Sequence, residues 1–470
     1  MPLLPESDSF ARRRGRRRRR GIFALLLLVV LAGLALAALR PGPPPTISLV
    51  PESPAIGRAV PVTVEVREPR RGIAGVRVEL QQGAASFELV DESFPTPAGW
   101  KLWATGAAER SWRLEVGKNA QPGLTEGEAT LRVTALPAPA WLRAGRPAIA
   151  EIRLPVRLTP PTLAVLSTQH YVTQGGAEAV RYQVGPTSVR DGVVAGDWFF
   201  PGYPLPGGGA GERFALFAVP YDLDDVSRVR LTAADEVGNL REASFVDRFF
   251  PMAPRADDIQ LDDAFLAKVV PEILANTPSL ADRGNLLENY LQINRELRRA
   301  NAAELRQLAT KTRPGFLWRA GFLALPGGQV MSSFADRRTY FYGGREVDRQ
   351  DHLGFDLASV AKADVPAANT GFVVLARYFG IYGNTVVIDH GYGLMSLYSH
   401  LSSIAVQEGA EIARAQVIGK SGATGLAGGD HLHFTFLLHG LPVRPVEWWD
   451  PHWLRDRLQR KLGAALPLAG

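Results

Sequence analysis

Two short segments near the C-terminal end of the chain combine histidine and aspartate with alternating apolar residues. One reads His-Leu-His-Phe-Thr-Phe and the other reads His-Leu-Gly-Phe-Asp-Leu. Because successive side chains of a β-strand point to opposite faces, His431 and His433 would share one face of the first strand. His352 and Asp356 would likewise share one face of the second strand. Imidazole nitrogen and carboxylate oxygen are ligands that zinc favours, so the two segments predict a zinc site.

A third segment, Tyr-Ser-His-Leu, contributes His400 and brings the number of candidate groups to five. A catalytic zinc site uses three protein ligands and leaves one position open for water. The surplus therefore suggests three ligands and two histidines that handle protons or stabilise charge, as a metal-assisted hydrolase requires. The alternative is that these are ordinary core or surface histidines. Only His170 of the eight histidines lies N-terminal to this region, however, and the clustering favours a site.

Residues 330–449 resemble the lysostaphin and LytM-type zinc metallopeptidases, which cut peptide cross-links in bacterial peptidoglycan. The resemblance is carried by the three histidine-containing segments and by two strand-and-turn segments, Gly383–Gly391 and Gly419–Gly425. Ala335 and Ala415 stand where the family usually has glycine. These two departures concern the local turn geometry, whereas every metal and catalytic position of the family is filled.

The resemblance implies a role for each of the five residues. His352, Asp356 and His433 correspond to the three ligands of a single zinc ion. His400 and His431 correspond to two histidines that do not bind the metal but orient or deprotonate the water and stabilise the transition state. The implied reaction is hydrolysis of an amide by zinc-activated water. Which of the two histidines takes the proton and which stabilises the carbonyl oxygen is left open, as is the peptidoglycan bond that is cut.

The N-terminal end of the chain predicts a membrane anchor. Residues 12–20 contain eight arginines in nine positions, and an apolar run follows at residues 22–39. That run would span about 27 Å as a helix, close to the thickness of a bilayer core. Arginines stay in the cytoplasm, so residues 1–21 would be a cytoplasmic tail and residues 22–39 a signal anchor in the inner membrane. The alternative is a cleaved signal peptide, because Ala35-Leu36-Ala37 resembles a small-x-small cleavage site.

The positive charge of the chain is confined to this end. Residues 1–20 contain eight arginines against Glu6 and Asp8, which gives +6, and the whole chain also has a net charge of +6. The other residues are therefore neutral overall, and no basic surface is left for nucleic acid. The absence of cysteine excludes disulfides and a lipoprotein anchor.

Two β-rich regions are expected after the anchor. Strand-like alternations such as Val62–Val66, separated by turn signals, predict a β-sandwich domain at residues 46–159. A second, Ig-like β domain is expected at residues 161–250, where Ala234–Asn239 resembles a strand-end motif of bacterial immunoglobulin-like repeats. These domains could bind glycan or protein, although the plainer interpretation is that they are spacers.

The pattern changes to that of a helical connector at residues 258–312. Apolar residues with a 4-3-4-3 spacing indicate an amphipathic helix there: Leu286, Tyr290, Ile293, Leu297 and Ala300. Such a stripe usually packs against a neighbouring domain, but it could also belong to a regulatory arm that covers the groove. The zinc metallopeptidase domain would follow at residues 318–455.

The sequence thus predicts a multidomain, mainly β protein with an N-terminal transmembrane helix, two Ig-like β-sandwich domains, a helical connector and a C-terminal antiparallel LytM-type metallopeptidase domain. We expect a zinc metalloendopeptidase that acts on peptidoglycan stem peptides, with its C-terminal domains in the periplasm or outside the cell. The alternative is a non-catalytic LytM-type regulator or envelope scaffold that controls another cell-wall hydrolase. An envelope regulatory protein is a further candidate partner.

Overall fold

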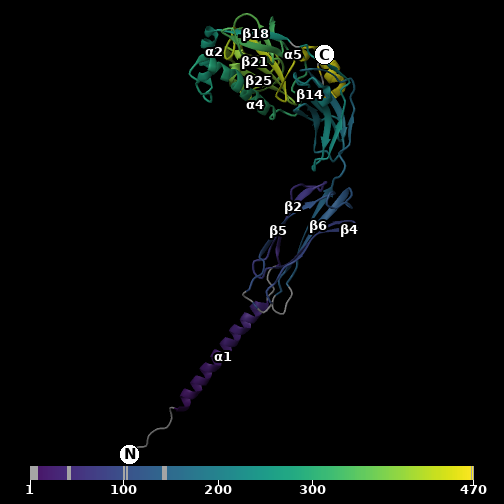
Figure 1. The fold of residues 1–470 in the computed structure, drawn as a ribbon, viewed down its shortest axis with the longest axis vertical. Coiled ribbons are helices and arrows are strands. Elements are labelled where there is room, and N and C mark those ends of the chain that lie inside the picture. The colour runs from purple at the N-terminus through teal and green to yellow at the C-terminus, as the bar shows by residue number, and fades with distance from the viewer. Residues whose placement is uncertain are drawn as a thin grey trace, which may run out of the picture. The chain divides into compact units, whose positions relative to one another are not determined.

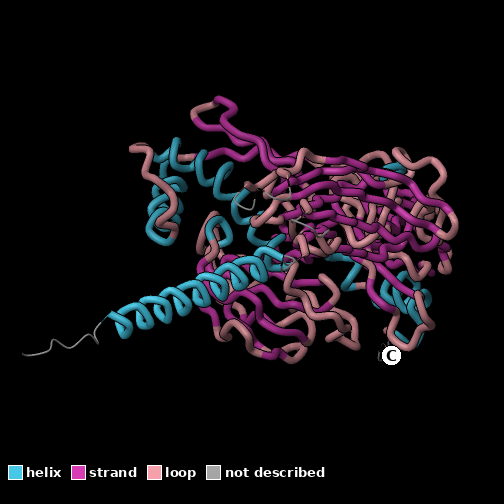
Figure 2. Tube along the Cα trace, turned by 90° about the horizontal axis from the view of Figure 1, so that it is seen from below, coloured by secondary structure: helices cyan, strands magenta, loops and turns pink. Residues whose placement is uncertain are grey.

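The protein is mainly β with few helices, as the sequence predicts (Figures 1 and 2). Residues 1–8, which are part of the predicted cytoplasmic tail, lie outside the described residues. Of residues 9–39, only the side chains of residues 20–36 are described. The computed structural model describes the backbone of residues 9–39, 44–98, 101, 104–139, 145–253, 255–466 and 468.

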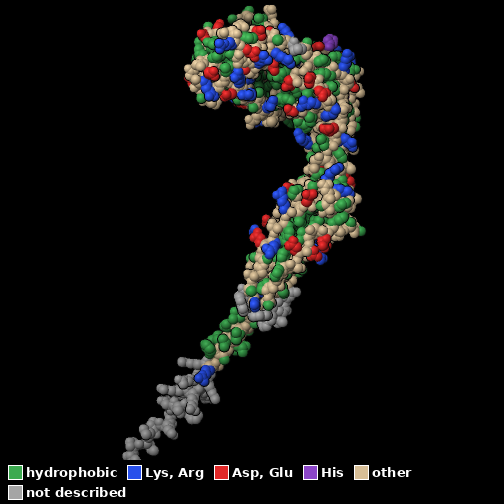
Figure 3. All heavy atoms as spheres, in the orientation of Figure 1, with side chains coloured by type: hydrophobic (Ala, Val, Ile, Leu, Met, Phe, Trp, Pro, Cys, Tyr) green, Lys and Arg blue, Asp and Glu red, His purple; other side chains and the backbone are tan. Residues whose placement is uncertain are grey.

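The N-terminal helix α1 (Ser9–Leu39) runs through the predicted anchor. Its described side chains, at residues 20–36, are exposed, and the apolar ones form the green stretch of this helix in Figure 3. A membrane-spanning helix needs about 20 apolar residues in succession. Among the residues that the structure describes, no helix is long and apolar enough to cross a membrane. The transmembrane signal anchor expected at residues 22–39 is therefore not supported.

The chain divides into two compact units. Unit 1 is residues 1–160 with residues 236–239, and unit 2 is residues 161–235 with residues 240–470. Unit 1 has two sheets around one core, in which Val62, Val64 and Leu131 are fully buried. The sheets have the strand orders β1-β2-β5 and β4-β3-β6-β7. Their strands are β1 (Thr46–Pro51), β2 (Val60–Arg67), β3 (Ile73–Gln82), β4 (Ala85–Ser93), β5 (Glu109–Val116), β6 (Gly127–Pro137) and β7 (Ala148–Val156).

Unit 2 begins with a second β-rich part, which we call the Ig-like part (residues 161–250). Its two main sheets have the orders β13-β14-β10-β8 and β12-β11-β15-β16, and buried Tyr182, Phe200 and Phe214 belong to its core. Its elements are β8 (Leu163–Val165), β9 (Tyr171–Thr173), β10 (Ala177–Val184), β11 (Arg190–Ala195), β12 (Trp198–Pro201), β13 (Tyr203–Pro204), β14 (Glu212–Ala218), η1 (Val226–Arg228), β15 (Val229–Ala234), β16 (Leu240–Ala243) and β17 (Arg248–Phe250).

The C-terminal part of unit 2 is built on an antiparallel sheet with the order β19-β22-β30-β26-β25-β24-β28, and β31 pairs with β30. Central strand β30 is buried along its whole length. The strands are β19 (Gln329–Ser332), β22 (Phe355–Ala358), β24 (Gly371–Tyr378), β25 (Asn384–Gly391), β26 (Leu394–Leu401), β28 (Glu411–Ile412), β30 (Leu432–Leu438) and β31 (Leu441–Val443).

Smaller elements surround this sheet. One side sheet has the order β18-β20-β21 and another has the order β23-β29-β27. Their strands are β18 (Ala256–Leu261), β20 (Asp336–Tyr342), β21 (Arg345–His352), β23 (Asp364–Pro366), β27 (Ser403–Ile404) and β29 (Val417–Lys420). The short helical turns are η3 (Gly380–Tyr382), α5 (Pro445–Trp449), α6 (Pro451–Trp453), η4 (Leu454–Gln459), α7 (Arg460–Leu462) and η5 (Gly463–Ala465).

The helices of the connector region are α2 (Asp263–Asn276), α3 (Leu286–Gln292), the π-helical turn η2 (Ile293–Leu297) and α4 (Arg298–Ala309). The side chain of Asp262 caps α2 and that of Asn285 caps α3, as the preference for these residues at helix N-termini predicts. Three residues of the predicted stripe are buried, but Ala300 is exposed and Asn301 is buried instead. A π-helical turn holds one extra residue, which moves the buried face along by one position.

The Ig-like part packs on the C-terminal helices through buried ionisable groups. The backbone N–H of Ala177 donates to Oε2 of Glu447 at 2.7 Å, and Lys461 pairs with Glu178 at 2.7 Å. A Cβ atom on Gly176 would lie 2.3 Å from Oε1 of Glu447, so glycine is needed for this approach. Burial raises the pKa of Glu447 to about 8. In the folded protein this carboxyl therefore keeps its proton up to a pH well above the usual range for a glutamate.

Glu447→Gln should make stability less dependent on pH, because an amide does not titrate. An unfolded glutamate has a pKa of about 4.3. The contribution of protonated Glu447 to the free energy of unfolding is therefore complete below that pH, and it is lost as the pH rises through about 8. As the pH rises from about 5 to about 8, the free energy of unfolding of the variant should increase by about 1 kcal/mol or more relative to that of wild type. Urea unfolding of the full-length protein measures this. Exposed Glu411 gives the control Glu411→Gln, and an equal shift in both variants would contradict the prediction.

Candidate metal centre

Two paired strands bring three of the predicted site residues together. Strand β22 runs antiparallel to β30 and places Asp356 opposite His433, while His352 ends β21. Nε2 of His352 lies 3.0 Å from Oδ1 of Asp356 and 3.0 Å from Nδ1 of His433. Nδ1 of His433 lies 2.9 Å from the same oxygen. The three side chains are almost fully buried and form a compact group whose nitrogen and oxygen atoms face one another.

The chain bends between His352 and Asp356, where the sequence predicts one continuous strand. Strand β21 ends at His352 and β22 begins at Phe355. A Cβ atom at Gly354 would lie 2.5 Å from the ring of His433. Only glycine can pass this close to the imidazole, so the bend brings the ends of two strands onto the same group.

Asp356 and His433 suit a zinc ion in their protonation states as well as their positions. Burial would raise the pKa of Asp356, but hydrogen bonds with His352, His431 and His433 hold it well below the usual value. Burial lowers the pKa of His433 to about 4. Nδ1 of His352 lies 3.0 Å from the carbonyl oxygen of Ser333, an acceptor that fixes the ring with Nε2 toward the group. An ionised carboxylate and neutral imidazoles are the forms that bind zinc.

Arg338 holds the second oxygen of the aspartate. Its Nη2 donates to Oδ2 of Asp356 at 3.0 Å, which leaves Oδ1 to the two histidines. Arg338 lies on β20, two residues beyond Asp336, which is paired with His352 in the strand register. This arginine could not be predicted from the sequence, because only the register between β20 and β21 shows that it lies beside the site.

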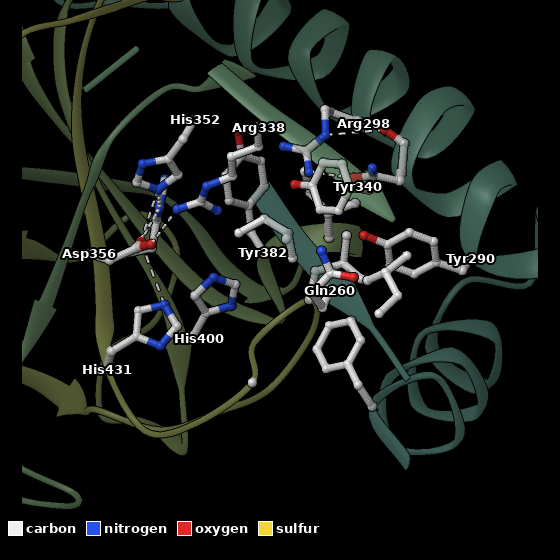
Figure 4. A pocket seen from close by; sticks show the side chains of 18 residues that line it. Gln260, Tyr290, Arg298, Arg338, Tyr340, His352, Asp356, Tyr382, His400 and His431 are labelled. Atoms are coloured by element: carbon white, nitrogen blue, oxygen red, sulfur yellow. Dashed lines mark hydrogen bonds and ion pairs between the residues drawn. The ribbon is translucent and has the colours of Figure 1, made fainter. Parts of the chain in front are cut away.

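His400 and His431 lie on the opposite side of Asp356 from His352 (Figure 4). Nδ1 of His400 is 2.7 Å from the carbonyl oxygen of Thr424, and Nδ1 of His431 is 2.9 Å from that of Gly429. Each Nδ1–H is therefore held by the backbone, which leaves Nε2 of each ring to face the site. Nε2 of His431 lies 3.6 Å from Oδ1 of Asp356. The ring centroids of His400 and His431 are 4.9 Å apart.

Backbone strain positions His400 and two turns. His400 has a φ of 61° at an irregularity in the pairing of β25 with β26, and such a bulge turns a side chain away from its regular direction. Ala335 and Ala415, which stand where the resembled family has glycine, have φ angles of 64° and 70°. Both turns thus keep a left-handed conformation without glycine, at a cost of about 1–2 kcal/mol each.

The metal centre opens into a cavity of about 350 Å³, which we call the main cavity. Its other wall comes from β18, α2, α3 and α4 (Figure 4). A second cavity of about 210 Å³, the side cavity, also borders His352 and His433 and reaches Trp198 and Tyr221 of the Ig-like part. The residues of the connector and the Ig-like part that line these spaces were not predicted from the sequence. They include Leu261, Phe265, Tyr290, Arg298, Trp198 and Tyr221.

The five predicted residues therefore lie in one group. All five border the main cavity, and His352 and His433 also border the side cavity. His352, Asp356 and His433 form the part that could hold a metal ion. His400 and His431 flank it, each with its Nδ1 held by a backbone carbonyl. This arrangement can bind a divalent cation beside two groups that exchange protons.

Part of the chain is similar to a known protein family and to named relatives. The model of Peptidase family M23 matches residues 350–445. The chain is 37% identical over 119 residues to Peptidoglycan DD-endopeptidase ShyA of Vibrio cholerae, covering 25% of this chain and 27% of that protein. It is 39% identical over 95 residues to DD-carboxypeptidase/endopeptidase Mpg of Neisseria meningitidis, covering 20% and 22%. The chain thus spans about a quarter of the length of these relatives.

The chain is also similar to a protein named as an activator and to a solved structure. The chain is 30% identical over 139 residues to Murein hydrolase activator EnvC of Escherichia coli, covering 30% of this chain and 33% of that protein. The solved catalytic domain of the antimicrobial peptidase lysostaphin from Staphylococcus simulans is 21% identical, with a TM-score of 0.21. That match covers 30% of this chain and 96% of the lysostaphin domain.

His433→Ala and Asp356→Ala should each abolish stoichiometric zinc binding, because removal of one of three ligands leaves an incomplete set. Zinc content after dialysis, measured by elemental analysis of the full-length protein, tests this. His452 is exposed and outside the cavities, so His452→Ala should retain zinc. Zinc lost in His431→Ala but retained in Asp356→Ala would exchange the roles of those two residues.

Proposed function

We propose that this chain, whose residues 350–445 form a domain of Peptidase family M23, is a zinc-dependent endopeptidase that hydrolyses peptide cross-links of bacterial peptidoglycan. The convergence of His352, Asp356 and His433 is the observation that carries the proposal. Two relatives named as peptidoglycan or DD-endopeptidases support the substrate class.

His352, Asp356 and His433 would hold the zinc ion through Nε2, Oδ1 and Nδ1, the atoms that face one another. Bound there, zinc would supply a Lewis acid that lowers the pKa of water and polarises the carbonyl oxygen of the scissile amide. Arg338 would keep Asp356 ionised and in place through Oδ2. The bend at Gly354 would keep the ligand-bearing strands close enough for all three groups to act together.

His400 and His431 would perform the proton transfers. The backbone carbonyls of Thr424 and Gly429 hold the Nδ1–H of each ring, so proton exchange takes place at Nε2. One ring would accept the proton of the attacking water, and the other would donate a hydrogen bond to the carbonyl oxygen as charge develops. The two rings are adjacent, so a proton taken from water can be returned to the leaving amine within the site.

Control of another cell-wall hydrolase is a second candidate function, and the similarity to Murein hydrolase activator EnvC favours it. A protein with that role would not need the complete set of five polar groups. Incubation of purified peptidoglycan with the zinc-loaded protein separates the two functions. Soluble fragments that appear with wild type and not with Asp356→Ala support the peptidase, and no release by either protein would favour the regulator.

We further propose that the catalytic domain works outside the cytoplasm, where peptidoglycan lies. The arginine-rich segment at residues 12–20 and the apolar run that follows it in the sequence support this orientation. Its location at the inner membrane is a prediction from these residues alone.

His400→Ala and His431→Ala should retain zinc and lose most turnover. A positioned general base or a single oxyanion donor typically contributes about 10²- to 10⁴-fold in rate, so the loss of kcat should fall in that range. Release of soluble peptides from purified peptidoglycan measures turnover, and elemental analysis measures zinc. His452→Ala is the matched control and should keep full activity. Full activity in His400→Ala would remove His400 from the mechanism.

A compartment reporter fused after Gly470 should be active outside the cytoplasm and silent inside it. The arginines on the N-terminal side of the apolar run set this orientation. Replacing the arginines at residues 12–20 with glutamate should reduce the external signal, which separates orientation by charge from passive release. A cytoplasmic signal from the unmodified fusion would overturn the proposed location.

A further inference from the structure

An arginine of the connector region faces the metal centre from the opposite wall of the main cavity. Arg298 begins α4 and lines both the main and the side cavity, together with His352, Tyr382 and His433. Figure 4 shows its guanidinium across the cavity from the histidines and beside Tyr340. Arg298 lies outside residues 350–445, the part of the chain that matches the model of Peptidase family M23.

The guanidinium of Arg298 is held in position by a neighbour one turn earlier. Its Nε donates to the carbonyl oxygen of Asn294 at 3.2 Å, and its Nη2 donates to Oδ1 of the same residue at 2.6 Å. Asn294 is fully buried and donates from Nδ2 to Oδ2 of Asp348 at 2.9 Å. The arginine is thus oriented before any ligand arrives, which reduces the entropy lost on binding.

Arg298 differs from Arg338 and Arg295 in lacking a carboxylate partner. Arg338 is paired with Asp356 and Arg295 with Asp348, at 3.0 Å and 2.9 Å. Among the described residues, no aspartate or glutamate lies within ion-pair distance of Arg298. Its positive charge acts within the cavity, where it opposes part of the rise that burial causes in the pKa of Tyr382. An oriented and unneutralised guanidinium in a cavity is suited to bind a carboxylate.

We propose that Arg298 binds a substrate carboxylate next to the scissile amide and thereby selects the type of cross-link that is cut. The inference rests on the proposed function. In a cross-link made through the side-chain amine of a diamino diacid such as diaminopimelate, the carbon bonded to the scissile nitrogen also bears a carboxylate. A glycine bridge carries no charged group at that place. Arg298 therefore favours a diamino diacid cross-link with its carboxylate free over a glycine bridge or an amidated cross-link.

The test uses two cross-linked peptide dimers that differ in one group. Both contain a D-Ala–diaminopimelate cross-link, and the carboxyl group beside the scissile nitrogen is free in one and amidated in the other. Wild type should cleave the free form about 10- to 100-fold more efficiently in kcat/KM, the range expected for a charge-assisted hydrogen bond. Arg298→Gln should lose that factor on the free form and little on the amidated form. Arg298→Lys should lose an intermediate amount, because lysine keeps the charge without the two-pronged geometry.

Arg299→Gln is the matched control, since Arg299 is the adjacent residue of α4, is exposed and lines neither cavity. It should cleave both dimers as wild type does. Zinc content and the unfolding temperature of each variant show whether the metal centre and the fold are intact. Equal losses on the two dimers in Arg298→Gln, or no loss on either, would overturn the inference.

A failure of the proposed peptidase function can be told apart from a failure of the proposed role of Arg298. If zinc-loaded wild type cleaves neither dimer, the peptidase function is wrong, and the affinity of each dimer for wild type and for Arg298→Gln then decides the role of Arg298. Isothermal titration calorimetry should show tighter binding of the free form to wild type and equal binding of both forms to Arg298→Gln. Equal affinity of wild type for the two forms would overturn carboxylate recognition in that case as well.

Discussion

The mutual approach of two imidazoles and a carboxylate is the constraint on which the C-terminal half of the protein depends. Their facing nitrogen and oxygen atoms lie 2.9–3.0 Å apart in a buried site. Lone pairs at this distance repel unless a proton or a cation lies between them. The surroundings oppose that repulsion: Arg338 neutralises Asp356, the carbonyl of Ser333 fixes His352, and the ladder between β22 and β30 holds His433. A divalent cation would hold the three groups together in place of the hydrogen bonds between them.

Three stretches of chain that are far apart in sequence surround this centre. The antiparallel sheet supplies the polar groups, the connector supplies one wall of the main cavity, and the Ig-like part reaches the side cavity. Tyr290 of the predicted connector stripe packs with Tyr340 and also lines the main cavity. Buried Glu447 and the pair of Glu178 with Lys461 join the Ig-like part to the C-terminal helices. The Ig-like part is therefore more closely tied to the site than a spacer would be.

Alternation along the sequence was enough to predict the strand that contains His433, because every second residue of β30 packs into the core. The five polar residues also proved to be neighbours in space. Three features depend on contacts between distant segments and could not be seen in the sequence. Gly354 leaves room for the His433 ring, His400 lies at a bulge, and the register of β20 with β21 places Arg338 beside the site. The π-helical turn before Arg298 likewise breaks the regular helical period from which faces are predicted.

The connector is attached to the sheet by more than side-chain packing. Strand β18, which leads into α2, pairs in parallel with β20 along six residues from Ala256 to Leu261. Swinging this wall away would break a ladder of backbone hydrogen bonds in one step. The fold consequently holds this wall of the main cavity in place. A substrate would have to fit the cavity as it stands, without a movement of the wall that widens it.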